Sequence, residues 1–134
     1  MSDMAEEKHR AKTWFWELRD MIVAAFEDLE ARHTDGPFSD MAPGAFDVSE
    51  TKRHSDDGSD AGGGLMSVMR GGRVFEKVGV NVSAVYGTLK PDAQAAMAAR
   101  KDMPGIKDDP RFWASGISLV AHMRNPQCPA VHMN

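Results

Sequence analysis

The sequence has almost no cysteine, no long apolar run and no excess of positive charge. Its 134 residues contain one cysteine, Cys128, which rules out an intrachain disulfide and fits a reducing compartment. The apolar run at residues 21–26 is far too short to span a membrane. The net charge of -4 argues against a general nucleic-acid binder, because such proteins need excess Lys and Arg to neutralise phosphates.

The remaining composition is ordinary for a globular protein, with 42% hydrophobic and 27% charged residues. The first ten residues are charged and acidic, unlike a secretory signal. We therefore expect a cytoplasmic protein without a membrane span. The length suffices for one domain with one core.

Residues 1–33 carry the periodicity of one long helix. Ser2 is the predicted N-cap, and the acidic residues that follow it suit the positive end of the helix dipole. Apolar residues recur three and four positions apart, at Phe15, Leu18, Ile22, Ala25, Phe26 and Leu29. This stripe predicts packing on a large, flat surface.

Residues 34–61 show no periodicity and are predicted to form a long loop. Four side chains in this segment could suggest a metal site, but their spacing matches no calcium loop, so we interpret them as solvated: His54, Asp56, Asp57 and Asp60. The glycine run at residues 62–64 lacks the Lys-Ser/Thr pair of a phosphate-binding loop. It predicts a backbone that passes close to a neighbouring segment.

Residues 62–134 are predicted to be sheet strands with one helix near residues 91–100. Gly71 and Gly72 indicate a two-residue hairpin turn between two of these strands. The last segment reads as the start of a strand, so we expect the chain to be a piece of a longer product. Together the elements predict an α+β fold.

Polar residues near the end of the chain share one face of their predicted strands. Because side chains alternate, Ser118, Val120 and His122 point the same way, with Ser118 and His122 roughly 13 Å apart. In an antiparallel hairpin with His122 opposite His132, their Cβ atoms would lie about 5 Å apart. That distance suits either a shared metal ion or a shared acid–base role. Asn134 would lie on the same face, opposite Val120.

Two histidines do not complete a zinc site, which needs three or four ligands. A single Ser or His on a strand is also more often structural than catalytic. The residues alone therefore predict only a polar wall that is wide enough for a flat ligand.

Four segments resemble the aerobic coproporphyrinogen III oxidases in sequence, order and spacing: residues 62–70, 72–83, 114–126 and 129–134. The long N-terminal helix also fits that family. The resemblance covers less than half of a family chain, and it implies that residues 1–134 are the N-terminal part of a single domain. It implies a large, flat antiparallel sheet flanked by helices on both faces, and a homodimer.

The resemblance also implies a reaction. Two propionate groups of coproporphyrinogen III become vinyl groups, giving protoporphyrinogen IX in haem biosynthesis, with O2 as the oxidant. The substrate is a small molecule and no organic cofactor takes part. A divalent metal has been proposed for the family, but the resemblance does not require one.

By motif, Ser118 and Asn134 correspond to substrate-binding residues of the family. His132 corresponds to the catalytic proton donor, and His122 and His132 to proposed metal ligands. Arg124 is either a propionate contact or a turn-stabilising side chain.

Further site residues of the family lie beyond Asn134, so we expect this chain by itself to be inactive. The alternatives to the oxidase are a truncated inactive fragment and a non-enzymatic tetrapyrrole- or metal-binding module.

Overall fold

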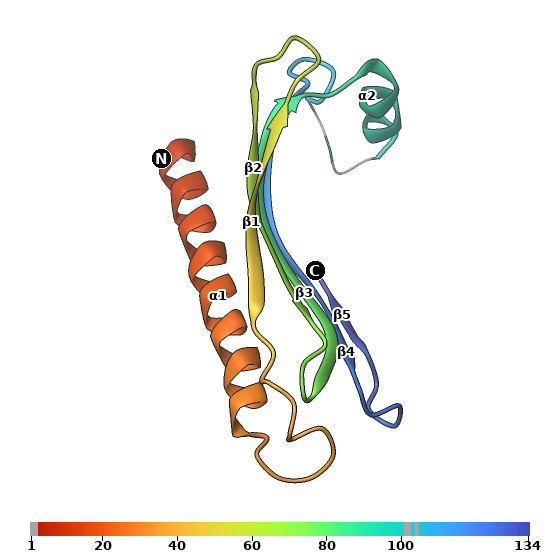
Figure 1. The fold of residues 1–134 in the computed structure, drawn as a ribbon. Coiled ribbons are helices and arrows are strands. Elements are labelled where there is room, and N and C mark those ends of the chain that lie inside the picture. The colour runs from red at the N-terminus through yellow and green to blue at the C-terminus, as the bar shows by residue number, and fades with distance from the viewer. Residues whose placement is uncertain (1–2, 101–102, 104) are drawn as a thin grey trace.

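The computed structural model describes residues 3–100, 103 and 105–134, which form one antiparallel five-stranded sheet and two helices. The strands follow the chain in the order β1-β2-β3-β4-β5, so each strand pairs with the next. The elements are α1 (Met4–Arg32), β1 (Phe46–His54), β2 (Asp60–Arg70), β3 (Phe75–Thr88), α2 (Pro91–Ala98), β4 (Arg111–Met123) and β5 (Val131–Met133). In Figure 1 the sheet is seen edge-on, with α1 along one side and α2 at the upper end of the other. The predicted α+β class with an antiparallel sheet is confirmed.

Helix α1 is the long helix predicted for residues 1–33, with a different cap. The predicted cap, Ser2, lies outside the described residues, and Asp3 is the N-cap. The Asp3 side chain accepts a hydrogen bond from the backbone N–H of Ala5 at 3.1 Å, which satisfies one of the free donors at the helix start. Neither this helix nor α2 combines the length and the apolar character that crossing a membrane requires.

The core lies between α1 and the sheet. Ile22, Val23 and Phe26 pack against a buried cluster made of Met69, Phe75, Val78, Val80, Leu119 and Ala121. The ring of Phe26 meets the ring of Phe75 edge-on, with centroids 4.9 Å apart. Each large apolar side chain buried in this way contributes about 1.5–3 kcal/mol to the free energy of folding.

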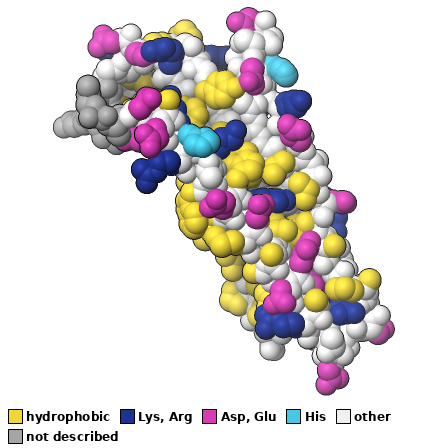
Figure 2. Space-filling view, turned by 90° about the vertical axis from the view of Figure 1, so that its left-hand side faces the viewer, with side chains coloured by type: hydrophobic (Ala, Val, Ile, Leu, Met, Phe, Trp, Pro, Cys, Tyr) yellow, Lys and Arg dark blue, Asp and Glu magenta, His cyan; other side chains and the backbone are white. Residues whose placement is uncertain are grey.

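The outer side of α1 keeps apolar side chains in solvent. Leu29, which the predicted stripe included, is 43% exposed, and Trp14 and Met21 are also exposed. Figure 2, which views the molecule from the α1 side, shows apolar patches interleaved with acidic and basic side chains. The buried stripe is therefore narrower than the periodicity predicted.

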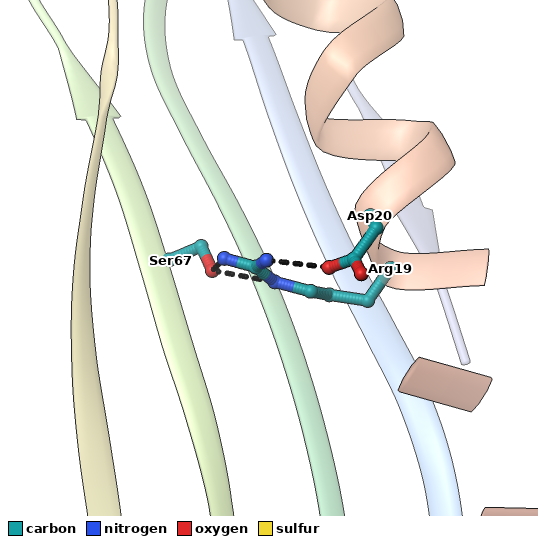
Figure 3. Close-up of polar contacts among 3 residues, drawn as sticks. All are labelled: Arg19, Asp20 and Ser67. Atoms are coloured by element: carbon teal, nitrogen blue, oxygen red, sulfur yellow. Dashed lines mark hydrogen bonds and ion pairs between the residues drawn. The ribbon is translucent and has the colours of Figure 1, made fainter. Parts of the chain in front are cut away.

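A polar contact fixes how α1 sits on the sheet (Figure 3). The nearly buried guanidinium of Arg19 donates to the Ser67 hydroxyl of β2, from Nη2 at 2.7 Å and from Nε at 3.2 Å. Its Nη1 pairs with the Asp20 carboxylate at 2.7 Å. Ser67 is fully buried, so the Arg19 bonds supply the partner that its hydroxyl needs.

The predicted loop at residues 34–61 holds for residues 34–45 and 55–59 and is wrong for the rest. Strand β1 occupies residues 46–54 and pairs with β2 from Phe46 opposite Met69 to His54 opposite Asp60. Almost every side chain of β1 is exposed, because β1 is an edge strand, and α1 contacts it at its first residue, Phe46. An edge strand needs no apolar alternation, so the pattern that predicts strands was missing, and its charges protect the edge from pairing with other chains.

The turn between β2 and β3 also differs from the prediction. The N–H of Gly72 donates to the carbonyl of Phe75 at 2.9 Å, so the turn closes around Arg73 and Val74 instead of Gly71 and Gly72. The cause is Glu30 of α1, whose fully buried carboxylate accepts the backbone N–H groups of Arg73, Val74 and Phe75.

Glu30 also accepts the N–H of Gly44, so one carboxylate joins two segments that are distant in sequence. Burial raises the pKa of Glu30, but the four backbone donors outweigh burial and hold that pKa below its usual value. A Cβ at Gly72 would collide with the Glu30 carboxylate, so a larger residue there would force the turn or the carboxylate to shift.

Candidate functional site

Among the described residues, α1 packs along one face of the sheet and contacts β3 and β4 there. Along β3 the residues that face α1 are buried, including Val78, Val80 and Val82. Their alternating neighbours on the other face, including Lys77 and Asn81, are exposed or half-buried. We call this second side of the sheet the open face.

The register of β3 and β4 places the predicted wall on the open face. Ser118 pairs with Asn81, Val120 with Gly79, and His122 with Lys77. Since Leu119 and Ala121 are buried under α1, the three predicted residues point away from the core together.

The predicted register of the β4–β5 hairpin is wrong by two residues. His132 lies opposite Val120, not opposite His122. Asn134 follows the end of β5, and continuing the register by one residue places it opposite Ser118 instead of Val120. All of these residues still share the open face, because a shift of two preserves the side of the sheet.

His122 and His132 meet as diagonal neighbours. Their Nε2 atoms lie 3.2 Å apart and their ring centroids 5.5 Å apart, with both side chains exposed. A hydrogen bond at this contact needs one N–H and one lone pair, so the two rings share one proton there. Protonating both rings would place two cations in contact. The pair is therefore suited to passing a single proton.

The same two Nε2 atoms could instead direct lone pairs at one metal ion. Two nitrogens that each bind a tetrahedral zinc ion at about 2.0–2.1 Å are about 3.4 Å apart, close to the observed separation. In the described part of the chain, no group of three or more His, Cys, Asp or Glu residues is placed to hold a metal. The pair thus fits a metal but does not complete a site.

Arg124 stabilises a turn. Its Nε donates to the carbonyl of Gly72, and its backbone N–H donates to the carbonyl of Val74 at 2.9 Å. Its guanidinium lies 4.8 Å from the ring centroid of Phe38. Because Arg124 directly follows β4, these bonds tie the start of the β4–β5 turn, and thus His132, to the β2–β3 turn held by Glu30.

A groove of about 670 Å³ lies on the other side of the sheet, between α1 and the first three strands, with Lys12 and Trp16 in its lining. There the Tyr86 hydroxyl donates to Asp60, and this bond raises the pKa of Tyr86 and lowers that of Asp60. The groove is separated from the histidine pair by the sheet itself, so it belongs to a different surface.

Sequence reasoning missed Lys77 and Arg70 as neighbours of the site. The register places Lys77 directly opposite His122, and Arg70 directly opposite Lys77. Alternation gives the face of each residue on its own strand, but only the pairing between strands brings the three side chains into one row.

Comparison with known proteins identifies relatives along nearly the whole chain. Residues 10–134 match the sequence model of the family described as coproporphyrinogen III oxidase. The oxygen-dependent coproporphyrinogen-III oxidase of Rickettsia peacockii is 40% identical over 129 residues, which cover 96% of this chain and 41% of that protein. The protein of the same name from Rickettsia bellii is 44% identical over 130 residues, which cover 96% and 42%. The chain thus spans about two-fifths of the length of these curated relatives.

Proposed function

Because the chain belongs to the coproporphyrinogen III oxidase family, we propose that it forms one wall of the active site that converts coproporphyrinogen III to protoporphyrinogen IX. The observation that carries the proposal is the contact between His122 and His132 on the open face, beside Val120 and Ser118. The relatives bear the name of this activity. The remaining part of the site would correspond to the three-fifths of the relatives that this chain does not span.

The proposed reaction consumes one O2 for each propionate. A propionic acid side chain and O2 give a vinyl group, CO2 and H2O2, with the carboxyl carbon leaving as CO2 and two electrons passing to O2. Since O2 accepts both electrons, no organic cofactor is needed. One proton leaves the carbon chain, and a positioned imidazole is an effective group for its transfer.

Each wall residue has a role in this proposal. His132 transfers the proton, and His122 holds the ring of His132 through the contact between their Nε2 atoms. Ser118 and Asn134 bind polar groups of the substrate. Between them, Val120 and Gly79 leave a low, partly apolar strip on which a flat macrocycle can lie.

His122 and His132 are the residues that would hold a divalent metal. A bound ion would supply positive charge that stabilises developing negative charge. The ion would need one or two further ligands from water, from substrate or from residues outside the described part of this chain.

We infer from the family resemblance that the full-length protein works as a homodimer in the cytoplasm. The presence of a single cysteine is in keeping with that reducing compartment. Size-exclusion chromatography with light scattering on the full-length protein tests the homodimer, and a monomer would contradict it.

A chimera tests the proposed activity directly. This chain replaces the equivalent two-fifths of the Rickettsia bellii relative, and the product is assayed for protoporphyrinogen IX and H2O2 in air and under argon. We expect turnover in air only, and loss of at least about 99% of it in the His132→Ala variant, within the usual range for a proton-transfer group. A folded chimera without turnover would contradict the proposal.

Experiments on the chain alone separate the two alternatives. Binding of coproporphyrinogen III without release of H2O2 favours a tetrapyrrole-binding module. Neither binding nor turnover, in a sample that circular dichroism shows to be folded, favours an inactive fragment.

A further inference from the structure

Three basic side chains cross the open face in one row. Arg70 of β2 pairs with Lys77 of β3, and Lys77 pairs with His122 of β4. Directly opposite residues in an antiparallel sheet have Cβ atoms about 4.5–5.5 Å apart. Three adjacent strands therefore place these side chains across roughly 10 Å. His132 extends the row through its contact with His122.

This row has no acidic partner in the part of the chain that the structure describes. Arg70 and Lys77 are both exposed, and neither takes part in an ion pair or a side-chain hydrogen bond there. Asp47 of β1 is on the same face but lies opposite Val68, one row away from Arg70. Like charges placed directly opposite each other destabilise a sheet, so an anion that binds between them would relieve this repulsion.

The rows next to it are neutral. Two residues further along each strand, the next row on the open face consists of Val68, Gly79 and Val120. The row after that consists of Met66, Asn81 and Ser118. A Cβ at Gly79 would meet nothing within 4 Å, so the sheet surface is low at that point. A ligand with a flat apolar body and carboxylates at its edge would complement these rows, with its body over Gly79 and a carboxylate on the basic row.

We propose that Arg70 and Lys77, beside His122, bind carboxylate groups of the substrate and thereby orient its macrocycle on the open face. The proposal rests on the proposed function, since it takes these carboxylates to be propionate groups. Arg70 can donate two parallel N–H bonds to one carboxylate, whereas Lys77 acts as a point charge between Arg70 and the histidine pair.

The test uses this chain and two stable probes. Coproporphyrin III is the oxidised tetracarboxylate, and its tetramethyl ester has the same macrocycle without the charges. Affinities are measured by fluorescence for the wild-type chain and for Lys77→Gln, Arg70→Gln and Lys77→Arg. The matched control is Lys52→Gln, because Lys52 is an exposed lysine of β1 that lines the groove on the α1 side. Thermal unfolding checks that each variant is folded.

We expect Lys77→Gln and Arg70→Gln each to weaken coproporphyrin III binding about tenfold, as for loss of a charge-assisted hydrogen bond. Lys77→Arg and Lys52→Gln should stay within about twofold of wild type, on the same reasoning, and binding of the ester should not change among the variants.

Three outcomes would overturn the proposal. Wild-type affinity in both Gln variants would contradict binding by the basic row, and so would an equal loss of affinity in Lys52→Gln. Either result leaves the proposed function unaffected. No binding of either porphyrin by the folded wild-type chain contradicts the proposed wall, and the basic row fails with it.

Discussion

The Nε2 atoms of His122 and His132 lie 3.2 Å apart, while the β4–β5 ladder places His132 opposite Val120. The two rings lean toward each other along the diagonal between neighbouring strands, with an angle of 33° between their planes. The contact depends on the β4–β5 hairpin, whose start Arg124 ties to the β2–β3 turn. The Glu30 carboxylate accepts backbone hydrogen bonds from the β2–β3 turn, at Val74 and Phe75. The hairpin that carries the exposed histidine pair is thus connected, through Arg124 and the β2–β3 turn, to a buried carboxylate on α1.

We predict that His122 and His132 bind one metal ion together. His122→Ala and His132→Ala should each weaken Zn2+ binding to the chain by at least about tenfold, because each removes one of two ligands. Isothermal titration calorimetry gives the affinities. His9→Ala on the exposed side of α1 is the matched control and should bind as wild type does. Unchanged affinity in His132→Ala would show that the pair does not hold the ion.

Glu30→Gln should destabilise the fold by about 3 kcal/mol, because an amide cannot satisfy four backbone N–H donors and brings its own N–H2 group among them. Urea denaturation measures the free energy of unfolding. Glu27→Gln is the comparison, since Glu27 accepts one such bond, from Phe46, and should lose about 1 kcal/mol. Equal losses in the two variants would contradict the role given to Glu30.

The lowered pKa of Glu30 predicts an acid-dependent loss of stability. The folded pKa lies below the ordinary value of 4.5, so the unfolded chain binds more protons as the pH falls. The contribution of Glu30 is therefore fully present above about pH 4.5 and is lost as the pH falls through the folded pKa. Urea denaturation at several pH values should show the difference in stability between wild type and Glu30→Gln shrinking in that window. A difference that stays constant down to acid pH would refute the linkage.

Two glycines make a matched pair. Gly72→Ala places a Cβ 2.3 Å from Oε1 of Glu30 and should cost about 1–3 kcal/mol of stability. Gly79→Ala meets nothing within 4 Å and should leave the free energy of unfolding within about 0.5 kcal/mol of wild type. Thermal or urea unfolding of both variants is the measurement, and a neutral Gly72→Ala would show that the turn can move away from Glu30.

Periodicity predicted those elements that bury one face. Helix α1 and strands β2, β3 and β4 can be recognised from the sequence, because their apolar residues recur at the spacing expected for a helix or strand with one buried face. Strand β1 has no such signal, because eight of its nine residues are exposed and its pairing with β2 rests on backbone hydrogen bonds, which any side chain permits. The position of the β2–β3 turn was missed because Glu30, more than forty residues away, accepts its N–H groups.

The sequence by itself determined that Ser118, Val120 and His122 share one side of a strand, and its motifs indicated the family. Side-chain alternation along a strand is a local property of the backbone, so no tertiary information was needed. Only the tertiary structure decided which residues lie beside them. Pairing between strands is set by packing and by the turns that join the strands, and it placed His132 diagonal to His122 and Lys77 directly opposite His122.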